Sequence, residues 1–481
     1  MREDRVRLGI VRAVSYGMFG PPEKFMPQLR ALGAGLVRVY VYWAQVEPRP
    51  GEYDWRVVDA LLAQLAPDDE VWVTVCSSSP WATTVPTDFQ PPSPATDDDA
   101  YGRFVRRLVE RFGGRVGWWQ CNNEPSNAGL LWAGTAPEYV HQLRIFAAAV
   151  RAADATSKVV LGGCGYDMLS SPDGSAPWQF FNTVLGAAGD SFDCFDVHLY
   201  DDPRHVQGHI RRARDLMRAH GYEREVVVGE YNGPTLFDFP GALAALEQAM
   251  TAAFAESARA PAVTMSTADL AGQVAAESPD RRALRRLYDD ADRQPRELRM
   301  FMADPPAGLA ALRDRVACRQ LAQRALLALS AGVRTLVCWN LAPVIGGYTD
   351  PYNVMDLMFG TLALMDWRDG RISAVRPTGH AHRLLARRLA GVTGLAPVAA
   401  GGGVHAFRMF TGTGPDRLAA WAGGDDPLDE DGPARRVRLD WPYRTARATD
   451  VFGHHPGLRL DSGTVELELG GTPVFITAAE R

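Results

Sequence analysis

The stretch WWQCNNEP (Trp118–Pro125) decides the fold prediction, because a short apolar run ends there in Asn-Glu-Pro. Proline has no backbone N–H and cannot donate to a sheet ladder, so the strand must end before Pro125. Glu124 is therefore expected at the C-terminal end of a strand. In a barrel of parallel strands that end forms the active face, so a carboxylate there is a catalytic candidate.

Seven further apolar runs predict strands, and helix-like patterns separate them. The eight predicted strands cover residues 6–14, 36–43, 71–76, 118–125, 159–164, 192–200, 225–230 and 334–340. Between them, helical spacing places Val57, Val58 and Leu61 on one face, and Phe104, Val105 and Leu108 on another. Near-continuous apolar strands joined by helices are typical of a parallel sheet, and eight of them predict an α/β fold, a (β/α)8 TIM barrel.

The 481 residues exceed what one barrel of about 250 to 400 residues requires, so an accessory domain is expected. Residues 379–389 predict the closing barrel helix, and the Gly/Ala-rich stretch 391–403 predicts a linker. From Val404 onward, short alternating runs separated by Gly, Asp and Pro predict an all-β sandwich. We therefore divide the chain into a catalytic barrel, 1–392, and a C-terminal β-sandwich domain, 393–481.

The seventh and eighth predicted strands are separated by far more residues than the others. The extra segment, about 240–312, begins with an Ala-rich helical pattern and continues into a charged run between Asp280 and Arg299. It predicts either a solvated helical decoration or a lid over the barrel mouth, because loops after the strands line the active face.

Composition excludes several classes of partner. The net charge is −6 with charges of both signs mixed along the chain, so neither nucleic acid nor a membrane surface is an expected partner. The charged start Met1–Arg5 lacks the apolar core of a signal peptide, and no apolar run is long enough for a transmembrane helix. The six cysteines lie in apolar runs or a helix without metal-ligand spacing, which favours reduced thiols in a cytoplasmic protein. No cofactor and no metal is expected.

A second carboxylate, Glu230, ends the seventh predicted strand in the run VVVGEYN. Because Glu124 closes the fourth strand, both lie on the C-terminal rim of the barrel, where strand ends can converge. Glycosidic-bond cleavage requires such a pair, with one carboxyl neutral to protonate the leaving oxygen and the other ionised to attack the anomeric carbon. A buried pair of like charges raises one pKa, which supplies that division of labour.

Other polar and aromatic residues are expected on the same rim. His198 and Tyr200 share one face of the sixth strand, since side chains alternate, and Tyr200 could donate a hydrogen bond to Glu230. Arg38 on the second strand could hold Glu230 ionised by its charge. Trp81 and Trp339 are predicted to end the third and eighth strands, where flat apolar rings suit the faces of sugar rings.

Together these residues resemble the clan A glycoside hydrolases, (β/α)8 barrels that cleave glycosides with retention. The resemblance implies that Glu124 is the acid/base, that Glu230 is the nucleophile and that Asn123 binds the sugar 2-hydroxyl. It matches the supporting residues of the clan to Arg38, His198, Tyr200 and Trp339. Ser79-Pro80-Trp81, Glu230-Tyr231-Asn232 and the predicted β-domain are most similar to glycoside hydrolase family 39, the β-xylosidase and α-L-iduronidase group.

The sequence therefore predicts a retaining O-glycosyl hydrolase that acts on a small glycoside or oligosaccharide by double displacement. One alternative keeps the site but transfers the sugar to another acceptor, or processes a natural-product glycoside. Another is a non-catalytic sugar-binding barrel. The sugar, its anomeric configuration, exo or endo action and the oligomeric state are left open.

Overall fold

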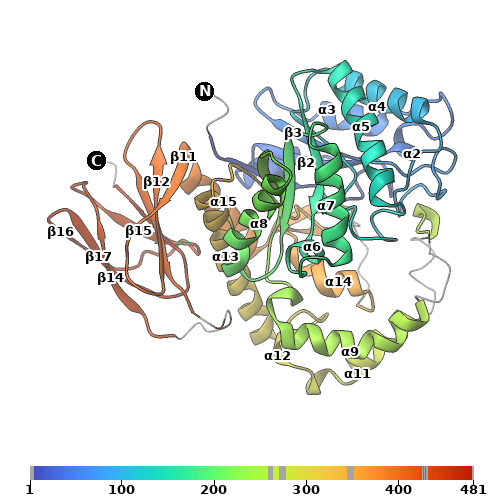
Figure 1. The fold of residues 1–481 in the computed structure, drawn as a ribbon. Helices are drawn as coiled ribbons and strands as arrows, with labels where there is room; N and C mark the ends of the chain where they lie inside the picture. The colour runs from blue at the N-terminus through green and yellow to red at the C-terminus, as the bar shows by residue number, and fades with distance from the viewer. Residues whose placement is uncertain are drawn as a thin grey trace.

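The computed structural model describes residues 5–257, 264–269, 278–343, 351–424, 426, 428 and 432–478. Eight parallel strands form a closed barrel in chain order, in which β1 pairs with both β2 and β8 (Figure 1). The strands are β1 (Arg7–Val11), β2 (Leu36–Tyr42), β3 (Glu70–Cys76), β4 (Trp118–Cys121), β5 (Lys158–Cys164), β6 (Cys194–Leu199), β7 (Glu225–Tyr231) and β8 (Thr335–Cys338). This confirms the predicted barrel, with strand ends shifted by a few residues.

Helices surround the barrel. They are α1 (Met26–Ala31), α2 (Trp43–Val46), α3 (Arg56–Leu62), α4 (Asp98–Phe112), α5 (Ala136–Ala153), α6 (Tyr166–Leu169), α7 (Ala176–Ala188), α8 (Val206–Ala219), α13 (Ala307–Ser330) and α15 (Pro377–Leu389), with short 3-10 turns η1 (Pro203–His205) and η2 (Leu236–Asp238). Side-chain caps start two of them. Asp97 accepts a hydrogen bond from Ala100 N–H at α4, and Thr135 forms a capping box with Glu138 at α5.

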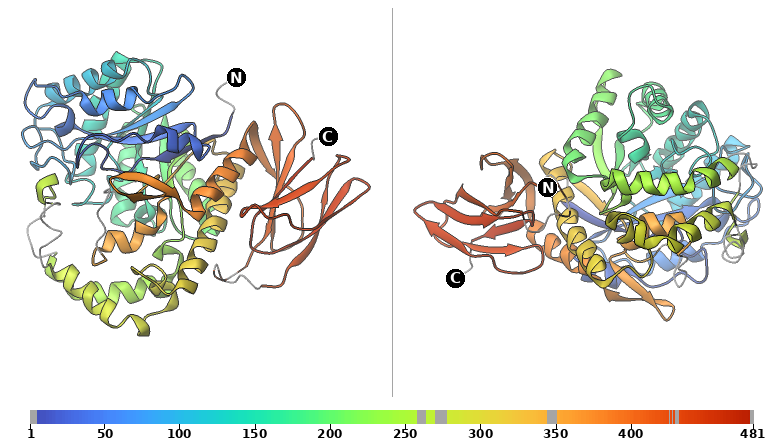
Figure 2. Two further views of the ribbon diagram at one scale, coloured as in Figure 1. Left: turned by 180° about the vertical axis from the view of Figure 1, so that it is seen from behind. Right: turned by 90° about the horizontal axis from the view of Figure 1, so that it is seen from below.

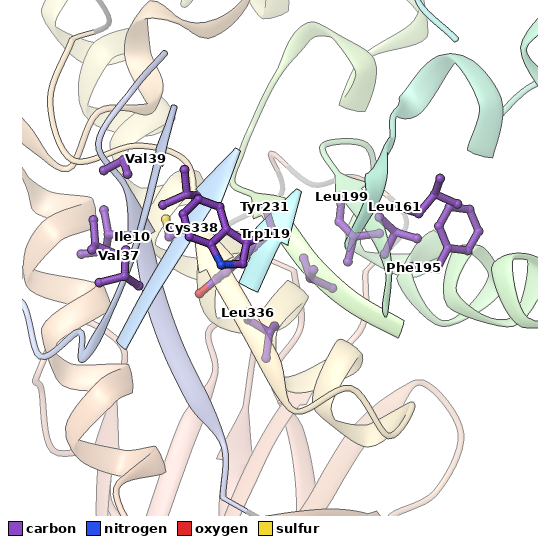
Figure 3. Close-up of a cluster of buried hydrophobic side chains, with 14 of the residues drawn as sticks. Ile10, Val37, Val39, Trp119, Leu161, Phe195, Leu199, Tyr231, Leu336 and Cys338 are labelled. Carbon is purple, nitrogen blue, oxygen red and sulfur yellow. The ribbon is translucent and has the colours of Figure 1, made fainter. Parts of the chain in front are cut away.

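Each barrel strand has two different faces, because side chains alternate along it. The outward face packs against the helices in one large apolar layer; Figure 3 shows part of it, with Ile10, Val37 and Val39 on neighbouring strands. The inward face of the same strands contributes Val11 and Tyr40 to a second cluster inside the barrel. Polar residues at inward positions are therefore carried toward the barrel axis, where the candidate site lies.

The predicted insertion contains α9 (Pro240–Ser257), α11 (Pro279–Asp289), η3 (Ala291–Arg293) and α12 (Arg296–Arg299). Its residues 258–263 and 270–277 lie outside the described part of the chain. Leu246, Leu284 and Leu298 belong to an apolar cluster of the insertion and its neighbours, separate from the barrel layers. Viewed from below, α9 and α11 lie across the end of the barrel (Figure 2, right).

A short piece of the insertion reaches the loop that follows β3. The Met265 N–H donates to the Gln90 carbonyl over 2.7 Å, and the Thr267 N–H donates to Asp88 Oδ1 over 2.8 Å. The loop after β3 leaves the C-terminal end of the barrel, so the insertion lies over the same end as the candidate carboxylates. This contact favours the lid interpretation over a decoration in solvent, and a role toward substrate remains a prediction.

Two antiparallel sheets follow the barrel, as the predicted β-sandwich requires (Figure 1). One has the order β11-β12-β13-β18-β15 and the other β14-β17-β16. The strands are β11 (Val392–Pro397), β12 (Val404–Thr411), β13 (Arg417–Ala422), β14 (Arg435–Asp440), β15 (Arg447–Asp450), β16 (Leu458–Asp461), β17 (Thr464–Leu469) and β18 (Val474–Thr477). Leu418, Leu439 and Leu467 share their apolar core. The division of the chain at 392/393 remains a prediction.

The prediction of a linker over 391–403 was wrong in part. Val392–Pro397 forms β11, which pairs antiparallel with β12 at the edge of the five-stranded sheet. Gly394, Pro397 and half-exposed side chains make this stretch resemble a connection, and these are residue types that edge strands tolerate. The segment between β8 and α15 also contains secondary structure, namely α14 (Val354–Phe359), η4 (Gly360–Leu362) and a hairpin of β9 (Met365–Arg368) and β10 (Arg371–Val375). Its residues 344–350 lie outside the described part of the chain.

The described residues contain no helix whose length and apolar character would suffice to cross a bilayer. All six cysteines lie within described segments, and each is a buried, unpaired thiol.

Candidate active site

Glu124 lies three residues beyond the end of β4, in a turn with unusual backbone geometry. Asn122 and Glu124 have φ values of 55° and 39°, in the left-handed region that side chains other than glycine rarely occupy. Such residues cost about 1–3 kcal/mol each and persist where the surroundings hold them. Here Asn122 N–H donates to Val75 O over 2.9 Å, and Asn122 Oδ1 accepts from Ser77 N–H over 2.9 Å. The neighbouring strand β3 and the loop after it therefore fix the turn that aims Glu124.

Glu230 lies at the end of β7 and is held by three donors. Tyr40 Oη donates to Oε1 over 2.6 Å, Arg38 Nη1 donates to the same oxygen over 3.0 Å, and Tyr200 Oη donates to Oε2 over 2.5 Å. The Glu230 side chain is only 6% exposed. Two phenols and a guanidinium all donate, so the surroundings suit a carboxylate anion in a fixed orientation.

Arg38 connects the strands around Glu230. Its Nη1 also donates to Gly229 O over 2.9 Å, and its Nη2 donates to Gln120 Oε1 over 2.8 Å and to Asn123 Oδ1 over 2.7 Å. Burial lowers its pKa, but the neighbouring Tyr40 and Glu230 outweigh burial and raise the pKa above its ordinary value. Arg38 is thus a permanently charged group, fully buried, that links β2 to β4 and β7.

His198 lies between two carboxylates. Its Nδ1 donates to Glu124 Oε1 over 2.5 Å and its Nε2 donates to Asp196 Oδ2 over 3.1 Å. Burial lowers the pKa of His198, but attraction from Glu230, Asp196 and Glu124 exceeds that effect and raises the pKa to about 10. The imidazole is therefore protonated at neutral pH and donates from both nitrogens.

A register shift brings His198 to Glu230. Between β6 and β7, Val197 pairs with Val228 but His198 pairs with Glu230, so Gly229 is an extra residue on β7. A Cβ at position 229 would collide with the Asp196 carboxylate, which accepts a hydrogen bond from the Gly229 N–H. Glycine at this position therefore allows the bulge that aligns the two side chains.

The surroundings of Glu124 favour the protonated form of its carboxyl group. Its pKa is raised above the ordinary value: burial is the main cause, the nearby charges of Glu230 and Asp167 add to it, and His198 opposes it. One oxygen of Glu124 and one of Glu230 lie within 4.8 Å of each other. The two carboxyl groups thus come close together while their surroundings differ, one supplied with three donors and the other with a raised pKa.

Asn123 lies beside Glu124 and is oriented by Arg38. Its Oδ1 accepts from Arg38, which leaves Nδ2 as the donor of the amide. The side chain is 9% exposed, so access to it is narrow. The structure thus brings Asn123, Arg38, His198 and Tyr200 together with both glutamates, and their predicted roles remain predictions.

The two predicted tryptophans have different surroundings. Trp81 does not end β3; it lies five residues beyond Cys76, where its Nε1–H donates to Glu47 O over 3.0 Å and its ring packs edge-on against Trp43. Trp339 directly follows β8 and belongs to the same buried cluster as Tyr40 and Tyr200. Trp81 thus packs against the layer that contains Trp43, Trp339 lies beside the tyrosines that contact Glu230 or Arg38, and substrate contact by either ring remains a prediction.

Sequence reasoning missed three residues of this network. Tyr40 donates to Glu230, Gln120 accepts from Arg38, and Asp196 accepts from both Gln120 and His198. A signal was present for two of them: Tyr40 is two residues from Arg38 and Asp196 two residues from His198, so each shares an inward face with a predicted site residue. Gln120 was visible as a polar residue inside the apolar run that ends in Cys121.

Aromatic rings gather beside the glutamates. Tyr166 stacks on Phe237 with centroids 4.1 Å apart, and Phe359 lies edge-on to both Phe237 and Tyr200. We call Tyr166, Phe237 and Phe359 the aromatic rim; all three are half-exposed. A Cβ at Gly165 would lie 2.9 Å from the Glu124 carboxyl, so the rim begins next to Glu124.

Metal binding at the glutamate pair is disfavoured by its own chemistry. Glu124, His198 and Glu230 each offer an atom within 4.8 Å of the others. A protonated imidazole, however, has no lone pair for a metal, and both nitrogens of His198 already donate to carboxylates.

Comparison with known proteins gives the fold. No protein-family model matches the chain, and no curated protein matches it. Several solved structures, by contrast, match the chain in fold. A family 39 glycoside hydrolase from the gut symbiont Bacteroides cellulosilyticus WH2 is 15% identical, with a TM-score of 0.60 over 100% of this chain and 82% of that one.

A glucosidase from Croceicoccus marinus is 14% identical, with a TM-score of 0.58 over 99% of this chain and 96% of that one. A monomeric β-xylosidase from Caulobacter crescentus CB15 is also 14% identical, with a TM-score of 0.56 over 98% of this chain and 95% of that one. At such identities the likeness establishes the fold. It confirms the barrel that the resemblance to clan A implied.

Proposed function

We propose that this protein is a retaining glycosidase of the clan A type, with Glu230 as nucleophile and Glu124 as acid/base. The observation that carries the proposal is the paired carboxylates, which approach within 4.8 Å in different surroundings. Retaining glycosidases hold their carboxyl groups about 5–5.5 Å apart, whereas inverting enzymes need about 6.5–9.5 Å to admit a water molecule. The solved structures of similar fold are described as glycoside hydrolases, which supports this class.

In the first step Glu230 attacks the anomeric carbon while Glu124 gives its proton to the leaving oxygen. The raised pKa of Glu124 favours the protonated form that this step requires. In the second step Glu124, now a base, deprotonates a water molecule that hydrolyses the glycosyl-enzyme. Protonated His198 donates to Glu124 and so stabilises the carboxylate formed between the steps.

The network around Glu230 has a defined task during these steps. The negative charge on Glu230 disappears when the glycosyl bond forms and returns when that bond breaks. Donors from Tyr40, Tyr200 and Arg38 stabilise it as a leaving group in the second step. Asn123, through the free Nδ2, is suited to donate to a sugar hydroxyl next to the anomeric carbon.

The substrate is proposed to be a small glycoside with an apolar aglycone. The aromatic rim starts at Glu124, the group that meets the leaving oxygen, so it lies on the side of the aglycone. Stacked rings bind flat apolar groups, because they bury apolar area and pack ring against ring in a preferred geometry. An apolar aglycone favours a natural-product glycoside among the alternatives that the sequence left open. If the enzyme transfers the sugar, an apolar acceptor would bind at the same aromatic rim.

A panel of aryl β-xyloside, β-glucoside, β-galactoside, β-glucuronide and α-arabinoside substrates tests the proposed activity. The likeness in fold to a β-xylosidase makes the β-xyloside the first substrate to test. Release of the aryl group from one or more of them supports glycosidase activity. Binding without turnover across the panel would instead support the non-catalytic sugar-binding barrel.

The pH profile is expected to report the raised pKa of Glu124. Because the acid must be protonated, kcat/KM should fall as the pH rises through the pKa of Glu124, which lies above its ordinary value. Glu124→Gln should lose this alkaline limb for aryl glycosides with an activated leaving group, which needs no proton. An unchanged alkaline limb in Glu124→Gln would assign the limb to another group.

Loss of the aromatic rim is expected to affect aryl substrates selectively. Phe237→Ala should raise KM for nitrophenyl glycosides roughly 10-fold, since an apolar contact contributes about 1–3 kcal/mol, and should leave the methyl glycoside of the same sugar nearly unchanged. Phe410→Ala, an exposed phenylalanine on β12, is the matched control. If Phe237→Ala raised KM equally for aryl and methyl glycosides, the aromatic rim would not lie on the aglycone side.

A further inference from the structure

A second cluster of ionisable side chains follows β6, outside the glutamate network. Asp201 lies two residues after the end of β6, His205 ends η1 and His209 lies in the first turn of α8. The two histidines are four positions apart in the sequence, so they lie on one side of this helical segment. Both approach the same oxygen: Asp201 Oδ2 is 2.9 Å from His205 Nδ1 and 2.8 Å from His209 Nε2.

We propose that Asp201, His205 and His209 bind a divalent transition-metal ion of the zinc class. Two imidazoles and one carboxylate form a donor set that zinc prefers, with a fourth position for water. The three donor atoms lie within 4.8 Å of one another. Tetrahedral ligands at bond lengths of about 2.0–2.1 Å are separated by about 3.3 Å, so the two distances from Asp201 Oδ2 to the histidine nitrogens would lengthen by a few tenths of an ångström to admit the ion.

The cluster is fixed on its inner side. Asp201 is 4% exposed, and its backbone carbonyl accepts hydrogen bonds from Arg324 Nε over 3.1 Å and Nη2 over 2.5 Å. Arg324 is fully buried and also pairs with Asp238 over 2.8 Å. The side chain of His209 is 10% exposed. Two of the three ligands are therefore held by the packed structure before any ion binds.

The cluster is open on its outer side. The His205 side chain is 61% exposed, so an ion can enter from solvent and a water molecule can complete the coordination there. In the absence of an ion, each imidazole donates an N–H to Asp201. Metal binding requires lone pairs at these nitrogens, so each ring must move its proton to the opposite nitrogen or release it.

The position of the cluster indicates a structural task for the ion. Asp201 directly follows Tyr200, whose phenol donates to Glu230, and Arg324 Nη2 also approaches the Tyr200 carbonyl at 3.3 Å. An ion that joins Asp201 to α8 would brace the segment that carries Tyr200. None of the three ligands takes part in the proposed glycosidase chemistry, so zinc binding here is independent of that activity.

Zinc chloride is the probe for this site, titrated into untagged full-length protein that has been stripped with EDTA. Calorimetry should show saturable binding of one equivalent, and the melting temperature should rise with zinc. His205→Ala should weaken zinc binding at least about tenfold and remove the rise in melting temperature, because one of three protein ligands is lost. Exposed His205 contributes little to the fold, so the variant is expected to remain folded by circular dichroism.

His141→Ala is the matched control, because His141 is an exposed histidine that contacts one carboxylate, Asp98, over 2.7 Å. It should bind zinc as the wild type does. Binding at Glu124, His198 and Glu230 would survive His205→Ala and so would contradict the proposal. Absence of saturable binding in the wild type, or equal affinity in the His205→Ala and His141→Ala variants, would also overturn it.

Discussion

Replacing Glu230 with alanine is expected to lower kcat/KM for an activated aryl glycoside by a factor on the order of 10⁴ or more. The variant loses the only proposed attacking group while Glu124 remains in place. Added azide should restore release of the aryl group, because a small anion can occupy the volume left by the carboxylate. The rescued product should be a glycosyl azide of inverted anomeric configuration, since a single displacement replaces two.

Glu225→Ala is the matched control for this variant. Glu225 begins the same strand, at the opposite end of β7, where it pairs with Lys158 over 2.6 Å. Its replacement should leave kcat/KM close to the wild-type value. Full hydrolytic activity in Glu230→Ala, or a rescued product of retained configuration, would contradict the assignment of the nucleophile.

Replacing Arg38 is expected to damage both stability and activity. Arg38→Met leaves Glu230 and Asp196 buried without their guanidinium partner, and removal of one member of a buried ion pair costs about 3–5 kcal/mol. The free energy of unfolding, measured by denaturant titration, should fall by about that amount. Arg56→Met, at an 86% exposed arginine that pairs with Asp54, should change it by less than about 0.5 kcal/mol.

Arg38→Lys separates charge from geometry. Lysine keeps the positive charge but cannot reproduce the planar donors that reach Gln120, Asn123 and Glu230 together. We expect a folded protein whose kcat/KM is at least about 100-fold lower, because a lost stabilising donor costs about 10² to 10³ in kcat. Wild-type stability and activity in Arg38→Met would show that this network is dispensable.

Both glutamates could be found from the sequence because the ends of their strands are marked in it. Asn-Glu-Pro closely follows the fourth strand, which ends at Cys121, and an apolar run leads directly to Glu230. Parallel strands in a barrel bring their C-terminal ends to one rim, so placement on the fourth and seventh strands was sufficient to predict proximity. The alternation of side chains along a strand placed Tyr200 and His198 on one face of the sixth strand.

The contacts among these residues could not be predicted in the same way. Strand register decides them, and the register between β6 and β7 shifts by one residue at Gly229. Without that bulge His198 would lie opposite Gly229 instead of Glu230. The left-handed turn that aims Glu124 depends on Ser77 and Val75 of a different strand and loop. These contacts join residues that are far apart in the sequence, so no periodic pattern of residue types indicates them.

Errors occurred where local composition and tertiary context disagree. β11 carries Gly394 and Pro397 and resembles a linker, yet pairing with β12 makes it a strand. Trp81 follows β3 at a distance in sequence, and its packing on Trp43 could not be anticipated from the run Ser79-Pro80-Trp81. The hydrogen bonds between Met265 of the insertion and Gln90 also depend on the folded barrel.

The central claim, covalent catalysis by Glu230, is tested most directly by trapping the intermediate. The reagent is an activated 2-deoxy-2-fluoro glycoside of a sugar that the substrate panel identifies; slow turnover of such a glycosyl-enzyme lets it accumulate. Intact-protein mass spectrometry should then show one added glycosyl group, and peptide mapping should find it on Glu230. A label on another residue, or turnover that yields an inverted product without any labelled protein, would contradict the account.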